Sequence, residues 1–270
     1  MKPITLSFTL IVFLLTSFSV TRTYSQADTS HFYSAPDGTN IYYEVKGRGY
    51  PVFLIHGFIV NSNTWKKSPV YQDLLNAGYQ VVIMDLRGNG RSDKPHTADA
   101  YANDAQAKDI MGIASELGIK KYAVIGYSRG SIITARLLAL DKRVNKAILG
   151  GMGAAFTNPE WPRRIQFYRA LTGENIPELK AMVQYVQQSG LDQLALAYQQ
   201  KEQPSTSKET LGKVKKQVLV ICGDQDTDNG SATELTALIP KAQFKTVPGN
   251  HNNTASSKEF SNEVLAFIKK

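Results

Sequence analysis

Short apolar runs alternate with longer amphipathic stretches along this chain from Pro51 onward. Strands of a parallel sheet are buried on both faces and read as short apolar runs, whereas their connecting helices read as amphipathic stretches. The alternation predicts an α/β fold in which helices cover both faces of a mostly parallel sheet. The predicted core strands are 52–55, 81–84, 122–125, 147–149, 218–222 and 244–247.

Two further strand-like segments, 31–34 and 41–45, precede these runs and are separated by Pro36-Asp37-Gly38. Proline, aspartate and glycine favour tight turns, so the two segments predict an antiparallel hairpin at the edge of the sheet. Helices are predicted at 65–76, 102–117, 131–140, 231–238 and 257–270.

The alternation stops in the segment 151–213, which is rich in glutamine and aromatic residues. Apolar residues from Leu179 to Val186 recur at the spacing of one helical face, which we expect to pack mainly on the core. The sequence therefore predicts a helical cap at 151–213, inserted into an α/β core formed by residues 28–150 and 214–270.

Residues 1–25 have the features of a secretory signal peptide. Lys2 is followed by the apolar stretch 4–20 and then by small residues, and cleavage fits after Ser25 or Ala27. An uncleaved membrane anchor is the alternative, because this stretch approaches the length of a membrane span. Threonine and serine interrupt it and no basic cluster follows, which favours cleavage. We expect an exported protein, periplasmic or secreted, without stable membrane insertion after cleavage.

Charge and cysteine content exclude several classes of function. The formal net charge is +8, and the basic residues are scattered rather than gathered in a stripe with aromatic residues, which disfavours nucleic-acid binding. Cys222 is the single cysteine, so an intramolecular disulfide and a thiolate-rich metal site are excluded. The four histidines lack the spacing of a metal site, and we expect no metal.

A G-x-S-x-G pattern, Gly126-Tyr127-Ser128-Arg129-Gly130, lies between the predicted strand 122–125 and the predicted helix 131–140. A serine on such a strand-to-helix turn has its Oγ exposed, and the helix N-terminus offers free N–H groups to a developing negative charge. The pattern alone recurs by chance, and a glycine-rich turn without chemistry is the alternative. Ser128 is the candidate nucleophile.

The partners that a serine nucleophile needs follow in the chain order serine, acid, histidine. A serine hydroxyl needs a base, and the base needs a group that orients it. His251, which follows the last predicted strand, is the candidate base, since imidazole takes up and returns protons near neutral pH. Asp224, Asp226 and Asp228 all lie within reach of the preceding strand end, so the residues alone leave the acid open.

Two further motifs complete a family pattern: His56-Gly57-Phe58 after the first core strand, and a D-x-R-G-x-G-x-S segment from Asp85 to Ser92. With these motifs, nearly the whole chain after the leader resembles the α/β-hydrolase fold family of serine hydrolases. The family usually has histidine at the position of Asn89 and glycine at that of Ser131. Neither departure concerns a catalytic atom.

The resemblance implies a role for each site residue. The family's G-x-x-D spacing selects Asp226 as the acid that orients His251, with Asp224 as the alternative. The backbone N–H groups of Phe58 and Arg129 are implied as the oxyanion hole, and no cofactor is needed. Serine at position 128 disfavours the dehalogenase and epoxide hydrolase branches, which use aspartate there.

Other polar residues near these motifs are assigned supporting roles. His56 is predicted to tie down its own loop by hydrogen bonding. Asp85 resembles the family's structural aspartate, which organises the turn at Arg87. The Arg129 guanidinium is interpreted as a surface or salt-bridged charge, with attraction of acidic substrates as the weaker hypothesis. Cys222 lies in an apolar run and is predicted to be an inert packed thiol.

The predicted activity is hydrolysis of small to medium carboxylic esters through an acyl-serine intermediate. The same catalytic residues support lactone opening, carbon–carbon bond hydrolysis and cofactor-free perhydrolysis. Two alternatives are not enzymes. One is a non-catalytic binding protein with this fold, and the other is a membrane-attached scaffold, if the leader is retained. The partner is expected to be a small ester-like molecule, and the sequence fixes neither its identity nor the oligomeric state.

Overall fold

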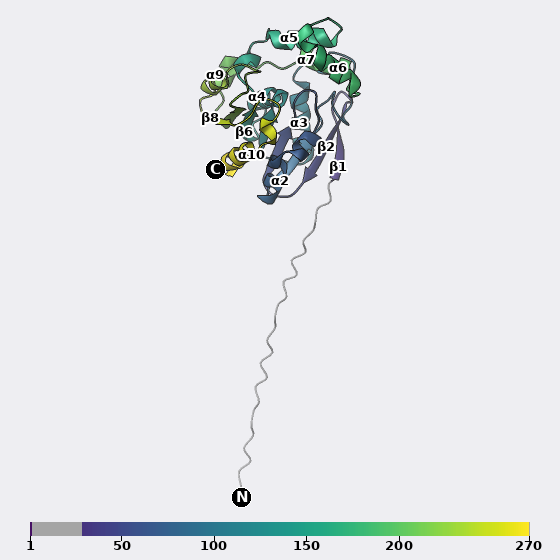
Figure 1. The fold of residues 1–270 in the computed structure, drawn as a ribbon. Coiled ribbons are helices and arrows are strands. Elements are labelled where there is room, and N and C mark those ends of the chain that lie inside the picture. Colours follow the sequence, from purple (N-terminus) through teal and green to yellow (C-terminus); the bar gives the residue numbers. More distant parts are fainter. Residues whose placement is uncertain (2–28, 270) are drawn as a thin grey trace.

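The computed structural model describes Met1 and residues 29–269 (Figure 1). Apart from Met1, the predicted signal peptide lies outside the described residues, so its cleavage stays a prediction. Within the described part, no helix is both long enough and apolar enough to cross a membrane.

An eight-stranded sheet forms the centre of the described chain, with the strand order β1-β2-β4-β3-β5-β6-β7-β8. Strands β3 to β8 run parallel to one another, and β2 is antiparallel to both β1 and β4. The mostly parallel sheet and its edge hairpin were both predicted from the apolar runs. The strands are β1 Thr29–Ser34, β2 Asn40–Lys46, β3 Pro51–Ile55, β4 Gln80–Met84, β5 Tyr122–Tyr127, β6 Val144–Gly150, β7 Gln217–Gly223 and β8 Ala242–Val247.

Helices pack on both faces of the sheet. Successive residues of a strand point to opposite faces, and Val124 and Ile125 of β5 accordingly belong to two separate apolar clusters. The first cluster includes residues of α3, α4 and α9, and the second includes residues of α1, α2 and α10. These helices are α1 Asn63–Lys67, α2 Pro69–Asn76, α3 Ala105–Glu116, α4 Arg129–Leu140, α9 Ala232–Ala237 and α10 Lys258–Lys269.

Two helix predictions need correction. The segment 65–76, predicted as one helix, belongs to two, because Pro69 disfavours helical geometry at the residue before it. Ser68 is extended (φ −83°, ψ 140°) and caps the second helix through its side chain. The helix predicted at 102–117 begins later, because Asp104 and the residue before it adopt left-handed conformations, with φ of 63° and 52°.

The chain between β6 and β7 is helical, and α5, α6 and α7 lie together at the top of the molecule in Figure 1. Its elements are η1 Ala154–Thr157, α5 Pro162–Leu171, η2 Pro177–Leu179, α6 Lys180–Gln188, α7 Gln193–Lys201 and α8 Lys208–Gly212. Leu171, Val186 and Leu196 form a small buried cluster, against which Phe58 and Ile59 of the loop after β3 pack. The helical segment therefore contacts the loop that is predicted to hold the oxyanion. Its assignment as a separate cap stays a prediction.

Candidate active site

Ser128 lies on the turn between β5 and α4, where its backbone is left-handed (φ 54°, ψ −121°). Such a conformation costs a non-glycine residue about 1–3 kcal/mol and persists only where the surroundings impose it. A Cβ at Gly126 would overlap the carbonyl of Gly130, and a Cβ at Gly130 would overlap the carbonyl of Ile55. The Ser128 N–H donates to the Gly150 carbonyl (2.8 Å). Close backbone packing therefore fixes the serine at the end of its strand.

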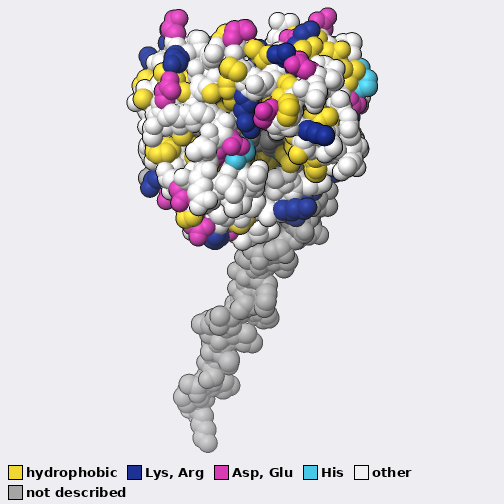
Figure 2. Space-filling model, turned by 45° about the horizontal axis from the view of Figure 1, so that its top comes forward, with side chains coloured by type: hydrophobic (Ala, Val, Ile, Leu, Met, Phe, Trp, Pro, Cys, Tyr) yellow, Lys and Arg dark blue, Asp and Glu magenta, His cyan; other side chains and the backbone are white. Residues whose placement is uncertain are grey.

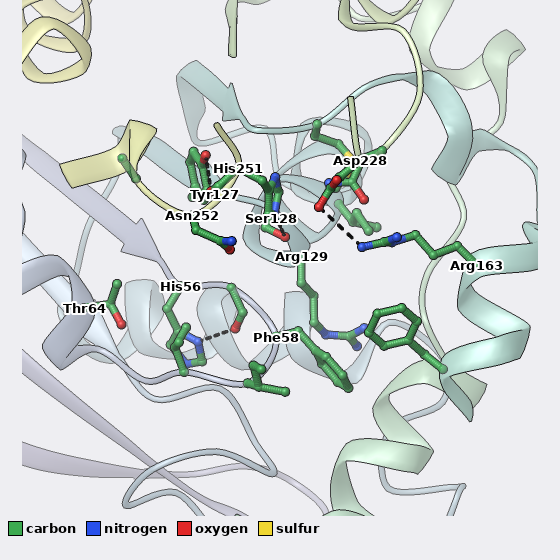
Figure 3. A pocket seen from close by; sticks show the side chains of 18 of the residues that line it. His56, Phe58, Thr64, Tyr127, Ser128, Arg129, Arg163, Asp228, His251 and Asn252 are labelled. Carbon is green, nitrogen blue, oxygen red and sulfur yellow. Dashed lines mark hydrogen bonds and ion pairs between the residues drawn. The ribbon is translucent and has the colours of Figure 1, made fainter. Parts of the chain in front are cut away.

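The structure brings Ser128, His251 and Asp226 together, and Figure 3 shows the side chains of Ser128 and His251 next to each other. The Ser128 Oγ lies 2.9 Å from His251 Nε2, and His251 Nδ1 lies 2.9 Å from Asp226 Oδ2. The Asp226 side chain is almost fully buried. Tyr127 donates its hydroxyl proton to the His251 carbonyl (2.8 Å), which fixes the backbone of the histidine.

Of the three acidic candidates, Asp226 is the one that contacts the histidine. Asp224 accepts a hydrogen bond from the Gly249 N–H (3.0 Å) and ties the end of β7 to the loop after β8. Asp228 lies 3.5 Å from Arg163 of α5, with which it forms an ion pair (Figure 3). The geometry thus favours the acid selected by the family spacing over both alternatives.

The N–H groups of Phe58 and Arg129 belong to two segments that adjoin Ser128. Arg129 is the first residue of α4, where an N–H has no partner within the helix. A Cβ added to Gly57 would lie 3.6 Å from the Ser128 Cβ, so the loop after β3 passes directly beside the serine. Within residues 29–269, neither N–H donates a hydrogen bond. Both are available to a ligand, and their role as an oxyanion hole stays a prediction.

His56 ties down its own loop, as predicted. Its Nδ1 donates to the Gly57 carbonyl (2.7 Å), and its Nε2 accepts from the Leu86 N–H (2.9 Å). These two bonds require the neutral tautomer with the proton on Nδ1. Burial lowers the pKa of His56, which also favours the neutral form.

Asn89 anchors the same loop, a role that the sequence does not predict. Its Nδ2 donates to the carbonyls of Phe58 (2.7 Å) and Val60 (3.0 Å), and its Oδ1 accepts from Gln199 of α7 (2.7 Å). The side chain is fully buried. The departure from the family's histidine therefore affects the segment that holds the candidate oxyanion donor.

Asp85 organises the turn that contains Arg87, as predicted, because its carboxylate closes the segment from Asp85 to Arg91. Asp85 accepts from the N–H groups of Ser62 and Arg91, both at 2.8 Å, and so joins two loops at the end of β4. The Arg87 side chain forms an ion pair with Asp37 (2.7 Å). It also forms a bidentate ion pair with Asp109 of α3, at 2.7 and 2.6 Å, in which both side chains are buried. Proximity in the sequence did not reveal this partner, because it lies on a helix that packs across the turn.

The interpretation of the Arg129 guanidinium as a surface or salt-bridged charge is wrong. The residue is buried, with 3% exposure. Its Nη2 donates to Gln106 Oε1 (2.7 Å) and to the Gln199 carbonyl (2.8 Å), and Nη1 donates to Gln203 Oε1 (3.3 Å). The guanidinium carbon lies 5.9 Å from the centre of the Phe58 ring. All of its hydrogen-bond acceptors in the described chain are neutral.

A cavity of ≈ 320 Å³ opens above the serine and is walled by the loop after β3 and by α5, α6 and α7. Figure 2 shows a hollow in this face of the molecule, bordered by hydrophobic and charged side chains. Its apolar walls include Phe58, Ile59, Trp161, Phe167 and Met182. Within residues 29–269, no group of three or more histidine, cysteine, aspartate or glutamate side chains is arranged to hold a metal ion.

Cys222 is buried at the end of β7, and its Sγ lies 3.7 Å from the Met152 carbonyl. Burial raises the pKa of this thiol to about 11, so it stays protonated at neutral pH. These properties agree with the predicted inert thiol.

Comparison with known proteins places the chain among related sequences and folds. A sequence model described as alpha/beta hydrolase fold matches residues 50–178. A non-heme haloperoxidase of Rhodococcus erythropolis is 28% identical, over 88% of this chain and 99% of that protein. A putative non-heme chloroperoxidase of Synechocystis is 38% identical, but over only 41% of this chain and 39% of that protein. An esterase structure from Exiguobacterium antarcticum aligns with a TM-score of 0.74 and 23% identity, over 90% of this chain and all of that one.

Proposed function

The chain belongs to the α/β-hydrolase fold family, and from this premise we propose that it hydrolyses carboxylic esters of small to medium size through an acyl-serine intermediate. The hydrogen bonds that join Ser128 to His251, and His251 to Asp226, carry the proposal. A nucleophile, a base within hydrogen-bond reach and an acid that orients the base are the requirements of acyl transfer.

In this mechanism the Ser128 Oγ attacks the ester carbonyl while His251 Nε2 takes its proton. Asp226 accepts the hydrogen bond from Nδ1, which holds the imidazole in the tautomer that leaves Nε2 free to accept, and it stabilises the imidazolium that forms. The imidazolium then gives its proton to the leaving alkoxide. Water, activated by the same imidazole, hydrolyses the acyl-serine and restores the free hydroxyl.

The N–H groups of Phe58 and Arg129 are the proposed donors to the oxyanion of the tetrahedral intermediate. Such donors act most strongly where they are already oriented and shielded from water, and the loss of one typically raises the barrier by about 2.7–4 kcal/mol. Two features support the assignment: the absence of internal acceptors for both N–H groups within residues 29–269, and the fixed position of the loop after β3.

The cavity supports the proposed range of substrate size. Its volume of ≈ 320 Å³ is at the lower end of the range of small-molecule sites, about 300–1,000 Å³. The aromatic and aliphatic walls can hold a short acyl chain or a compact alcohol group.

Mass spectrometry after treatment with a fluorophosphonate tests the nucleophile. We expect one adduct on Ser128, loss of the adduct in Ser128→Ala, and no change in Ser115→Ala, whose exposed serine lies on α3. Hydrolysis of 4-nitrophenyl esters from acetate to octanoate then tests the substrate class. A folded protein that forms no adduct and cleaves none of these esters would contradict the proposal.

Perhydrolysis is the second candidate, in which hydrogen peroxide replaces water at the acyl-serine and releases a peracid. It is favoured by the relatives that are named non-heme haloperoxidases, one of which aligns along 99% of its length. Bromide oxidation in the presence of acetate and hydrogen peroxide measures this activity, with Ser128→Ala as the control. Ester cleavage without Ser128-dependent bromide oxidation would leave only the first candidate.

We also propose that the protein is exported, on the basis of the leader-like sequence at residues 1–25. The intact mass of the protein from the producing cell tests this proposal. A mass that begins at Gln26 or Asp28 would support it, and a soluble exported form that retains residues 1–25 would contradict it.

A further inference from the structure

Arg129 places a buried positive charge in the wall of the cavity. Its side chain extends from the Ser128 turn alongside Phe58 (Figure 3), and both residues line the cavity. The nitrogens Nη1 and Nη2 donate only to neutral oxygens, and Nε has no hydrogen-bond partner. The arginine is therefore hydrogen-bonded in part but is not neutralised.

A buried charge without a counter-ion is unfavourable, and proteins normally pair it or hold it at a functional site. Burial lowers the pKa of Arg129 to about 9, so the guanidinium remains charged at neutral pH. The hydrogen bonds to glutamine and carbonyl oxygens solvate the cation in the way that water would. They leave its charge available to an anion that enters the cavity.

The other charged residues of the wall increase this positive character. Three arginines line the cavity, whereas Asp228 is the only carboxylate in its described wall. Asp228 is engaged by Arg163 at 3.5 Å. Arg164 donates to the carbonyls of Lys201 (2.9 Å) and Pro159 (2.6 Å), which again are neutral.

We propose that the substrate carries a carboxylate that binds in this cavity against the Arg129 guanidinium. The inference deepens the proposed function, on which it rests for the reacting group, and names the substrate as an ester with a second, anionic end. The Arg129 side chain is buried, with the Phe58 ring centre 5.9 Å from the guanidinium carbon, and burial limits its hydration. The guanidinium is therefore already desolvated and held in position before a carboxylate binds.

Paired substrates test the proposal. We would compare kcat/KM for 4-nitrophenyl hydrogen adipate and 4-nitrophenyl hexanoate, which differ by a charge on the acyl end. The pair 4-acetoxybenzoate and 4-acetoxybenzamide places the charge on the alcohol end. A charge-assisted hydrogen bond predicts a preference of about tenfold or more for the carboxylated member of at least one pair.

Arginine variants show whether Arg129 causes the preference. We expect Arg129→Met to abolish it and Arg129→Lys to retain part of it. In the matched control Arg169→Met, an exposed arginine of α5 outside the cavity wall is lost, and the ratio should not change. The readout is the ratio within a pair, because the Arg129 backbone belongs to the Ser128 turn and its replacement can alter both rates together. If Arg129→Met does not fold, the wild-type ratio and Arg129→Lys decide the outcome.

A binding measurement separates this inference from the proposed ester hydrolysis. Calorimetry on Ser128→Ala would compare monomethyl adipate with dimethyl adipate, and 4-acetoxybenzoate with 4-acetoxybenzamide. Carboxylate-dependent binding that is lost when Arg129→Met is added, but not when Arg169→Met is added, would support the subsite even if no ester is cleaved. Ester cleavage with no preference in either pair, and binding that ignores the carboxylate, would overturn the inference and leave the proposed function intact.

Discussion

Replacement of Asn89 by alanine should lower turnover far more than a loss of stability alone explains. The side chain forms three hydrogen bonds, to the carbonyls of Phe58 and Val60 and from Gln199. A typical internal hydrogen bond contributes about 1 kcal/mol net, so Asn89→Ala should reduce the free energy of unfolding by about 3 kcal/mol. The variant also frees the loop that carries the Phe58 N–H, a change that should cost up to 10²–10³-fold in kcat, about the effect of losing one oxyanion donor.

The assay is kcat for 4-nitrophenyl acetate together with urea unfolding. Leu74→Ala is the matched control, because Leu74 is fully buried in α2 outside the cavity wall and its truncation should cost about 2–5 kcal/mol. We expect the control to lose stability while the folded enzyme keeps its kcat. Asn89→His should fall between Asn89→Ala and wild type, since a neutral imidazole has one N–H donor for two carbonyls. A kcat of Asn89→Ala within threefold of wild type would refute the reasoning.

Three further predictions follow from the described contacts. Ser128→Ala and His251→Ala should each lower kcat by about 10⁴–10⁶-fold, measured with a 4-nitrophenyl ester, whereas a residual within tenfold of wild type would exclude the mechanism. Burial lowers the pKa of His56 in the folded state, so as the pH falls the unfolded chain takes up this proton before the folded protein does. The free energy of unfolding should therefore decrease below about pH 6.5, and urea unfolding from pH 7.5 to 5 should show a flatter pH profile in His56→Gln. Asp109→Ala should reduce the free energy of unfolding by about 2–3 kcal/mol, because it removes the bidentate ion pair to Arg87, whose remaining ion pair is with Asp37, and a loss below about 1 kcal/mol would contradict the importance of this pair.

The sheet could be predicted from the sequence because each buried strand is a short apolar run with a clear end. The observed strands begin or end within three residues of the predicted ones. The break at Pro69 was also available from the sequence, since the residue before a proline avoids helical geometry. The left-handed residue Asp104 left no comparable signal.

The roles of side chains could be predicted where a motif defines them. The predictions failed where a role depends on contacts between elements that are distant in the sequence. Ser128 and His251 follow from local patterns, and the family spacing selected Asp226 among three neighbouring acids. The buried Arg129 donates to Gln199 of α7, and Asn89, which anchors the loop after β3, accepts from the same residue; α7 follows both by more than sixty residues in the chain. Neither contact has a local signature, because each depends on how the helical segment packs against the loops of the sheet.

The hydrogen bonds from Arg129 to Gln199 and Gln203 limit how this enzyme can be diversified. The candidate catalytic groups lie on loops that follow β5, β7 and β8, so a different segment between β6 and β7 would reshape the cavity without replacing any of them. Such a graft would also remove two of the acceptors that solvate the arginine beside the nucleophile, and only Gln106 of α3 would remain. Recombination among relatives is therefore constrained at this junction: a chimera must either bring equivalent acceptors with the new helices or exchange Arg129 at the same time.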